Sequence, residues 1–552
     1  MEINEAYEKL FGDDEPIDLT RLTVLQDKAV DHFFRLFQRG SRGAVLSTPT
    51  GTGKTRVMFL LAERVLTELD RLDGPGNFAL IITTATAKWN TQREGLKWLK
   101  QYSPKDLVVI DGDAEARAAQ YVQIVSAKPR FIISNYDVVS DELPFYQNLM
   151  NDSRRNAIFP DEADNIQNPA SGYSVAVRAL CKRWGLAMTA TPVSNRANSA
   201  WALLDFSNPG NHFEWRMHKN WNPRFGSIKV RHFVPSPIWS DYESFTGMFC
   251  KVNERGYITG SKNMPELHRR LQNAGLVEWD KYKVLGIKPF QANTPMIDLT
   301  PDHRKYYDAR AEGVIQWLET TGRDEWANED RRTIVQNNML AIISGMKRAC
   351  ALSPIRDVAH LVNSKMNMPL DMKAFKLSYD NAKADWAAQF IQDHWQEGVF
   401  LWSQWGDTLQ DIMPRIHTVK RYTSLRVLDS SVSSVKRLTL QDEVQSGKCK
   451  VLLATPAGGA SLNFHALTHC IIFDLPWRAR DLTQAIGRIE RAGMQKDQAQ
   501  VWFPAMNQTI ETKRLVKLLD EKAKDSTEIL TGDRGRKSAV LFKDINDIIA
   551  ML

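Results

Sequence analysis

The chain has 552 residues, which is too long for a single hydrophobic core and predicts two or more domains. Hydrophobic residues make up 43% of the sequence and charged residues 25%, proportions that are ordinary for a globular protein. No apolar run approaches the roughly 20 residues of a membrane-spanning helix, which excludes a membrane protein. The net charge of +7 permits a polyanionic partner without indicating one by itself.

The cysteines are scattered along the chain and form no C-x-x-C pair. They are Cys181, Cys250, Cys350, Cys449 and Cys470. This spacing excludes a zinc site or a disulfide framework built on them, and it favours a reducing setting. The N-terminal stretch is acidic and lacks the apolar centre of a signal peptide. We therefore expect a cytoplasmic or nucleoid-associated protein, within the host cell if the source is viral.

Apolar β-type runs alternate with helical patterns in two separate blocks, which predicts βα units on parallel sheets and an α/β fold. In the first block the expected strands are 43–48, 78–84, 106–111, 131–136, 157–162 and 185–191. In the second block they are 398–404, 425–431, 450–456, 469–476 and 499–505. The predicted organisation is a tail (1–19), a first lobe that binds nucleotide (20–210), helical insertions with an inter-lobe linker (211–375), and a second lobe (376–552).

The sequence "STPTGTGKT" (47–55) lies between the first expected strand and a helical pattern, as in a phosphate-binding loop. Glycines let backbone N–H groups close around phosphates, and the N-terminus of the following helix adds positive potential. Lys54 can reach the β- and γ-phosphates of ATP, and Thr55 can hold Mg²⁺. Thr48 stands where the general pattern has its first glycine. The candidate nucleotide-binding residues are Thr50, Gly51, Thr52, Gly53, Lys54 and Thr55.

An acidic pair follows the fifth expected strand, in "FPDEADN". Asp161 would bind Mg²⁺, and Glu162 would orient and deprotonate the attacking water. Pro160, directly before the pair, stands where an apolar strand residue is usual. Together with the phosphate loop, the pair predicts an ATP hydrolase.

Positive charge on the transition-state γ-phosphate is expected from "QAIGRIERAGMQ" in the second block. Arg488 and Arg491 are three residues apart, so on a helix they would share a face. Both would act as arginine fingers, with Gln484 beside them in the nucleotide site. Because they come from the other block, catalysis would require two lobes to close.

These motifs, with several others in the same order, resemble a superfamily-two helicase-type motor of the Swi/Snf type. "TTATAKWNTQREGLKW" is similar to motif Ia of that family, "VFLWSQW" to motif IV and "ATPAGGASLNF" to motif V. "TATPVSN" and "SAWALLDFSNPG" are similar to two further family segments, and "YITGSKNMPELHRRLQNAGLVEWDKYKVL" to part of the HARP-like annealing-helicase branch. The resemblance runs from about Leu22 to about Asp533 and implies two RecA-like parallel-sheet lobes with helical insertions between them.

The resemblance also implies roles for particular residues. Gln26 would read adenine, and Thr189 and Thr191 would couple the nucleotide site to movement. Asp164 stands where the family usually has His. The candidate contacts to nucleic acid are Thr83, Thr84, Ser403, Gln404, Gly458, Gly459, Ser461 and Asn463. The implied function is a DNA-dependent ATPase that uses ATP and Mg²⁺ to translocate on double-stranded DNA and remodels protein–DNA complexes or DNA junctions.

Two other functions remain open from the sequence. The letters "DEAD" at 161–164 also occur in RNA helicases, although the motif around Thr189 and the arginine motif differ from theirs. A helicase that separates DNA or RNA strands is therefore one alternative. The other is a clamp whose affinity for a protein partner is switched by the bound nucleotide.

Overall fold

The computed structural model divides into two compact units, and among the described residues the first unit ends at Ile287 and the second begins at Lys288. The described residues are 19–151, 156–180, 182–193, 196–207, 213–218, 228–233, 242–253, 258–277, 279, 281–317, 343–363, 371–416, 424–456, 462–476, 479–491 and 493–512. In this part of the chain, no helix has both the length and the apolar character needed to cross a bilayer.

The first unit, lobe 1, is built on a six-stranded parallel sheet with the order β1-β6-β5-β2-β4-β3. The strands are β1 (Ala44–Ser47), β2 (Phe78–Thr83), β3 (Leu107–Val109), β4 (Phe131–Asn135), β5 (Asn156–Pro160) and β6 (Trp184–Thr189). All of the strands predicted in the first block are therefore confirmed. Their side chains are almost entirely buried, because helices cover both faces of the sheet.

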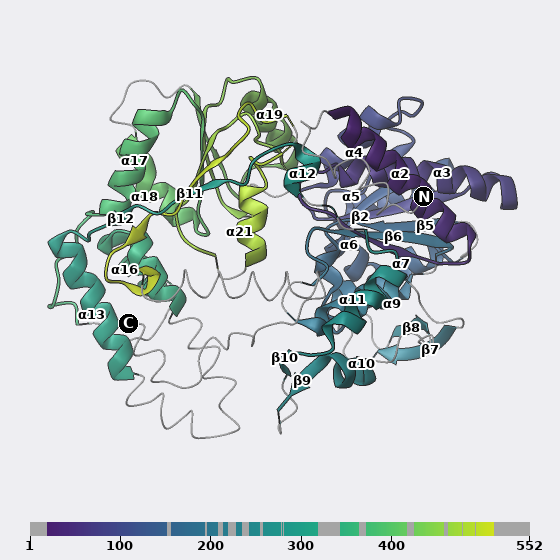
Figure 1. Cartoon of the computed structure of the whole chain (residues 1–552), viewed down its shortest axis with the longest axis horizontal. Helices are drawn as coiled ribbons and strands as arrows, with labels where there is room; N and C mark the ends of the chain where they lie inside the picture. The colour runs from purple at the N-terminus through teal and green to yellow at the C-terminus, as the bar shows by residue number, and fades with distance from the viewer. Residues whose placement is uncertain are drawn as a thin grey trace. The chain divides into compact units, whose positions relative to one another are not determined.

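The helices of lobe 1 form two layers around this sheet (Figure 1). On one face lie α3 (Lys54–Asp73), against which α2 (Leu19–Gln38) packs, and α4 (Lys88–Trp98). On the other lie α6 (Tyr136–Asp141) and α9 (Trp201–Ser207). This is a doubly wound arrangement, in which the carboxyl ends of the strands carry the loops that form sites.

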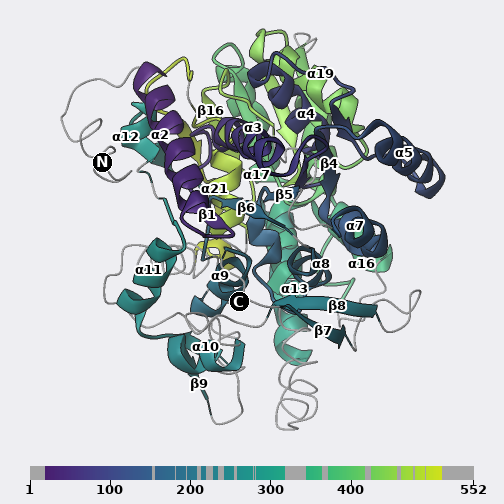
Figure 2. The same ribbon diagram turned by 90° about the vertical axis from the view of Figure 1, so that its right-hand side faces the viewer.

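The part of the predicted insertion segment that belongs to lobe 1 contains helices and also two antiparallel strand pairs that were not predicted. The first pair joins β7 (Phe213–His218) to β8 (Ile228–Phe233), next to α8 (Gly172–Ala179) (Figure 2). The second joins β9 (Cys250–Val252) to β10 (Ile258–Ser261). The helices are α10 (Tyr242–Phe249), α11 (Met264–Asn273) and α12 (Lys281–Leu285).

The second unit, lobe 2, has a six-stranded parallel sheet with the order β11-β17-β16-β13-β15-β14. Five of its strands confirm those predicted in the second block. They are β13 (Val399–Trp402), β14 (Leu425–Leu428), β15 (Val451–Ala454), β16 (His469–Ile472) and β17 (Gln500–Trp502). The edge strand β11 (Gln291–Asn293) was not predicted, and it comes from the segment expected to be insertions and linker.

Helices pack around the sheet of lobe 2. They are α13 (Pro301–Trp317), a helix at 343–351, α16 (Pro354–Asn363), α17 (Ala382–His394), α18 (Gly406–Ile416), α19 (Ser434–Gln445) and α21 (Ala479–Ile486). α17 and α18 lie against each other (Figure 1). Tyr306 and Tyr307 of α13 are fully buried in the same core as Phe400 of β13. The described residues from 288 onward thus belong to lobe 2.

A buried ion pair lies inside lobe 2. Lys383 Nζ is 2.6 Å from Glu511 Oε1, and both side chains are fully enclosed. The other carboxylate oxygen of Glu511 accepts a hydrogen bond of 2.9 Å from the Met506 N–H. The pair therefore ties the start of α17 to the segment after β18 (Ala505–Met506).

We expect Lys383→Met to destabilise lobe 2 by about 3–5 kcal/mol, because it leaves the Glu511 charge buried without its cation. Denaturant unfolding of the full chain measures this as a lower midpoint for the lobe 2 transition. The double variant Lys383→Met/Glu511→Leu removes both charges and should recover most of the loss. A single variant as stable as the parent would contradict the assignment of a charged pair.

Candidate active site

The phosphate loop connects β1 to α3 at the carboxyl edge of the lobe 1 sheet. Gly51 (φ 87°) and Gly53 (φ 82°) both adopt left-handed backbone conformations, which favour glycine. Gly53 is the N-cap residue of α3, so Lys54 and Thr55 form the first turn of that helix. The "GTGKT" motif therefore adopts the strand–loop–helix geometry that binds phosphate groups.

Hydrogen bonds within the loop fix its shape. The Thr52 hydroxyl donates to Pro49 O (2.8 Å) and lies 3.0 Å from the hydroxyl oxygen of Thr48. Lys54 Nζ donates to the carbonyl oxygens of Thr48 (2.6 Å) and Pro49 (3.1 Å). Thr48, which replaces the usual first glycine, is fully buried and supports the loop through its side chain.

Gln26 of α2 lies directly against the loop. Its Nε2 donates to Thr52 O (2.8 Å), and its Oε1 accepts a hydrogen bond of 3.0 Å from Arg56 of α3. A Cβ on Gly53 would stand 2.2 Å from Gln26 Nε2, so the amide fits only because residue 53 has no side chain. Gln26, which the sequence predicts to read adenine, thus supports the phosphate loop.

We expect Gly53→Ala to weaken ATP binding strongly. The change imposes a left-handed conformation on a residue with Cβ, at a cost of about 1–2 kcal/mol, and forces Gln26 away from the loop. Titration calorimetry with ATP measures the loss. The matched control is Gly74→Ala at the other end of α3, where φ is 80° but no atom lies within 4 Å of the added Cβ. Equal ATP affinities for the two variants would contradict a role for the Gln26 contact.

The acidic pair follows β5, next to β2 in the sheet. The Asp161 N–H donates to Ile82 O (2.7 Å), and the Asp161 carbonyl accepts a hydrogen bond of 2.7 Å from the Tyr136 hydroxyl. Glu162 has a left-handed backbone (φ 51°), and its N–H donates to Asp161 Oδ1 (3.0 Å). The chain turns sharply here, so the two carboxylates follow the strand at its carboxyl edge. Pro160 is accommodated as the last residue of β5.

Burial and, to a lesser extent, the nearby Glu162 carboxylate raise the pKa of Asp161 to about 7, although Lys54 opposes both effects. A bound cation beside Asp161, in addition to Lys54, would favour the ionised form of the Asp161 carboxyl. Carboxylate and hydroxyl oxygens are ligands that suit Mg²⁺. The donor set of Asp161 and Thr55 therefore fits the ion predicted from the sequence.

Two hydrogen bonds connect the acidic motif to the last residue of β6 and to the segment that follows it. The Thr189 hydroxyl lies 3.4 Å from Asp164 Oδ1, and Gln167 Nε2 donates to Thr191 O (2.5 Å). The Thr191 N–H in turn donates to the Thr189 hydroxyl (3.0 Å). Asp164 thus contacts Thr189 even though it replaces the usual histidine. The sequence analysis did not predict a role for Gln167. The only feature that could have indicated it is an amide side chain five residues after Glu162.

Hydrogen bonds to the carboxylate of Asp111 hold motif Ia against the segment that follows β3. Lys88 Nζ and Trp89 Nε1 both donate to the Asp111 carboxylate, at 2.8 and 2.7 Å. Partial burial opposes ionisation of Asp111, but these hydrogen bonds outweigh it and hold its pKa below the usual value. Of the two threonines proposed to contact nucleic acid here, Thr83 is fully buried and Thr84 is half-buried. The Thr83 side chain therefore does not reach the surface.

In lobe 2, Ser403 and Gln404 follow the carboxyl end of β13 and are both bound to Asp474. The Ser403 hydroxyl donates to the Asp474 carboxylate, and the Gln404 N–H donates to Asp474 Oδ1 (2.9 Å). Gln404 Nε2 and the buried Lys347 Nζ both donate to Leu475 O. Ser403 is fully buried, so its hydroxyl holds this loop together rather than facing solvent.

The motif V candidates are described only in part. Gly458, Gly459 and Ser461 lie outside the described residues. The Asn463 N–H donates to Gln441 Oε1 (2.8 Å), and the Asn463 carbonyl accepts a hydrogen bond of 2.7 Å from Gln445 Nε2. The backbone of Asn463 is therefore held by α19, and its side chain is half-buried.

The arginines of the last motif do not share a helix face, contrary to the sequence prediction. α21 carries Gln484 and ends at Ile486, and the turns that follow Gly487 carry Arg488 and Arg491. Arg488 is buried, and its NH1 donates to Leu462 O (3.3 Å); Arg491 Nε donates to Gly487 O (2.7 Å). The helical spacing rule fails here because the hydrogen bonding tightens to i→i+3 at Arg488 and Ile489.

Comparison with known proteins gives the family. The SNF2-related domain matches residues 25–352, and the helicase conserved C-terminal domain matches residues 382–493. The chain belongs to the SNF2-related family. With these two domains, it is an ATP-hydrolysing enzyme of the helicase type, and its two parallel sheets are RecA-like lobes.

Similar proteins come from Mycoplasma genitalium, Saccharomyces cerevisiae and Sulfolobus solfataricus. An uncharacterized ATP-dependent helicase of Mycoplasma genitalium is 23% identical over 489 residues, covering 87% of this chain and 40% of the relative. An ISWI chromatin-remodeling complex ATPase of Saccharomyces cerevisiae is 24% identical over 564 residues, covering 100% of this chain and 45% of the relative. The chain thus spans less than half the length of these relatives. A solved structure of the Sulfolobus solfataricus SWI2/SNF2 ATPase core in complex with dsDNA has 18% identity, 92% coverage of both chains and a TM-score of 0.36.

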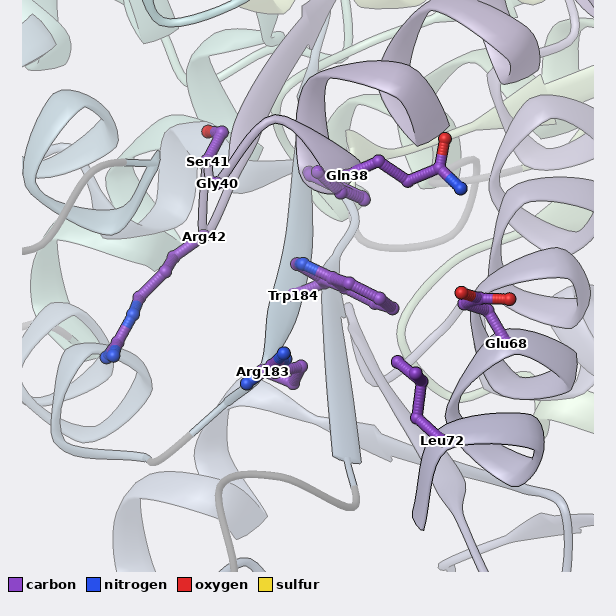
Figure 3. Close-up of a pocket in the computed structure, with 9 residues that line it drawn as sticks. Gln38, Gly40, Ser41, Arg42, Glu68, Leu72, Arg183 and Trp184 are labelled. Carbon is purple, nitrogen blue, oxygen red and sulfur yellow. The ribbon is translucent and has the colours of Figure 1, made fainter. Parts of the chain in front are cut away.

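A separate hollow of about 470 Å³ lies in lobe 1 of this SNF2-related protein, away from the phosphate loop (Figure 3). The Trp184 ring lines it beside Arg183, where β6 begins, and Gln38, Ser41 and Arg42 line it between α2 and β1. The phosphate loop follows the opposite end of β1. This hollow is therefore not part of the nucleotide site.

Proposed function

We propose that this SNF2-related enzyme is an ATP-driven translocase on double-stranded DNA that remodels protein–DNA complexes or DNA junctions. The observation that carries the proposal is the distribution of its chemistry over two RecA-like lobes. Lobe 1 carries the phosphate loop and the acidic pair, and lobe 2 carries the arginine turn. Such a division lets ATP binding and hydrolysis drive closure and opening of the lobes.

In the proposed reaction, Lys54 and the loop N–H groups hold the phosphates. Thr55 and Asp161 would hold Mg²⁺, which when bound would supply positive charge against the phosphate oxygens. Glu162 accepts the proton of the attacking water. Arg488 and Arg491 stabilise charge on the γ-phosphate, with Gln484 beside them.

The Gln167–Thr191 and Thr189–Asp164 hydrogen bonds support coupling between hydrolysis and movement. They join the segment that carries Glu162 to the end of β6 and the residues after it, so a shift of one displaces the other. The proposed DNA contacts are at Thr84, Gln404 and Asn463, together with Gly458, Gly459 and Ser461. Contacts of this polar, uncharged kind read the shape of the DNA backbone rather than its sequence.

The target is proposed as a protein–DNA complex because the yeast relative is named as a chromatin-remodeling ATPase. A DNA junction is the second target included in the proposal.

The decisive experiment is steady-state ATP hydrolysis by the purified chain without nucleic acid and with single-stranded DNA, duplex DNA or RNA. We expect strong stimulation by duplex DNA, displacement of a third strand from a DNA triplex, and no separation of a tailed duplex. The apparent DNA affinity should fall steeply with salt, because phosphate contacts release counterions. Stimulation by RNA or single strands with duplex separation would identify a helicase instead. No stimulation, with a protein partner whose affinity follows the nucleotide state, would identify a clamp.

A further inference from the structure

Two histidines and a glutamate meet at the amino-terminal edge of the lobe 2 sheet. His394 is the last residue of α17, and Glu397 lies in the turn that leads into β13. The Glu397 N–H donates to His394 O (3.0 Å), which fixes the spacing of the two residues. His469 is the first residue of β16 and pairs in register with Val399 of β13. The backbone therefore brings the three side chains together.

The distances within this cluster fit a small metal ion. His394 Nδ1 is 3.2 Å from Glu397 Oε1, and His469 Nε2 is 3.5 Å from Glu397 Oε2. One ligand atom from each residue lies within 4.8 Å of the other two. Ligands of tetrahedral Zn²⁺ with bonds of about 2.0–2.1 Å stand roughly 3.3 Å apart. Small rotations of these side chains would therefore reach coordination geometry.

The burial of the His469 side chain also suits a metal ligand. Its side chain is 6% exposed. Its Nε2 atom is buried, and the 3.5 Å contact to Glu397 Oε2 is too long for a well-formed hydrogen bond. An imidazole nitrogen enclosed beside a carboxylate oxygen is therefore placed to share a metal ion with it.

Two neighbours compete with a bound ion. Lys496 Nζ lies 2.7 Å from Glu397 Oε2 and holds the carboxylate as an ion pair. Trp502 Nε1 donates a long hydrogen bond of 3.3 Å to His469 Nδ1. Coordination through Nε2 places the imidazole proton on Nδ1, so it gives up that hydrogen bond. Removal of either neighbour should therefore strengthen metal binding.

We propose that His394, Glu397 and His469 form a site for one transition-metal ion of the zinc class, with water as the fourth ligand. Histidine nitrogen and carboxylate oxygen are common zinc ligands in this number. The site lies at the edge of the sheet opposite Ser403 and Gln404, which follow the carboxyl end of β13. A bound ion fastens the end of α17 to the start of β16 and takes no part in ATP hydrolysis.

The test uses the full chain purified without a histidine tag and without ATP, so that neither a tag nor a nucleotide binds the metal. Equilibrium dialysis against Zn²⁺ should give one ion per chain, and Co²⁺ should give the intense visible bands of tetrahedral coordination. Bound Zn²⁺ should raise the unfolding temperature of lobe 2. We expect His394→Ala and Glu397→Gln each to weaken binding by at least about tenfold. The control is His360→Ala, at a half-buried histidine of α16, which should leave binding unchanged.

Lys496→Met and Trp502→Phe test the arrangement from the other direction, because each should increase the affinity for Zn²⁺. Neither side chain is a ligand, so a gain cannot result from general damage to the fold. The proposal is overturned if Zn²⁺ fails to bind with one-to-one stoichiometry. It is equally overturned if binding persists in both His394→Ala and Glu397→Gln, or if Co²⁺ gives only the weak spectrum of octahedral coordination.

Discussion

Glu162→Gln should abolish ATP hydrolysis and leave ATP binding intact. The change keeps the size of the side chain but removes the proposed general base, whose contribution is typically about 10²–10⁴-fold in rate. The turn should persist, because it does not depend on the Glu162 carboxylate. It rests on the left-handed backbone of Glu162 and on the hydrogen bond from the Glu162 N–H to Asp161 Oδ1. Single-turnover hydrolysis and nucleotide titration measure the two effects separately.

Lys54→Ala is the companion variant, and it should also lose turnover. It differs in removing a phosphate contact, so ATP affinity should fall with the rate. Circular dichroism and thermal unfolding establish that both variants remain folded. Turnover close to the parent value in either folded variant would show that the acidic pair and the phosphate loop are not the hydrolytic site.

Arg488→Ala should reduce hydrolysis by about 10³-fold or more, as expected for loss of an arginine finger, while ATP binding persists. Arg488 is buried and also donates to Leu462 O, so the stability of lobe 2 has to be measured alongside the rate. The matched control is Arg426→Ala, which removes a half-buried arginine of β14 paired with Glu443. The control should keep its turnover.

Arg491→Ala separates the two arginines of this turn. If both fingers act, each single variant is slow, and the double variant is little slower than the worse of the two. An Arg488→Ala enzyme with unchanged turnover would show that this side chain only supports the Leu462 backbone.

Most of the fold could be predicted from the sequence because its strands are continuous apolar runs. Strands such as Val399–Trp402 are buried on both faces and leave a clear hydrophobic signal. β11 could not be predicted, because "QAN" is polar and largely exposed at a sheet edge. β9 and β10 are also short, so the context of the tertiary structure decides their pairing.

The candidate site divides in the same way. Local spacing in the sequence predicts a glycine-rich loop after a strand, and Gly51 and Gly53 lie in such a loop with left-handed backbone. It likewise predicts an acidic pair after a strand, and Asp161 and Glu162 directly follow β5. Contacts between distant segments do not follow from spacing. The Gln167–Thr191 bond, and the use of Ser403 to bind Asp474, depend on packing that only the fold determines.

The edge strand β11 has a practical consequence for dividing this protein. A fragment that starts at residue 376, where the second lobe was expected to begin, would lack β11 and the buried tyrosines of α13. The bare edge of β17 could then pair with another chain and promote aggregation. The matched SNF2-related region ends at residue 352, well inside lobe 2, so it is not a folding boundary either. An autonomous second lobe has to start at Lys288, directly after the last described residue of lobe 1.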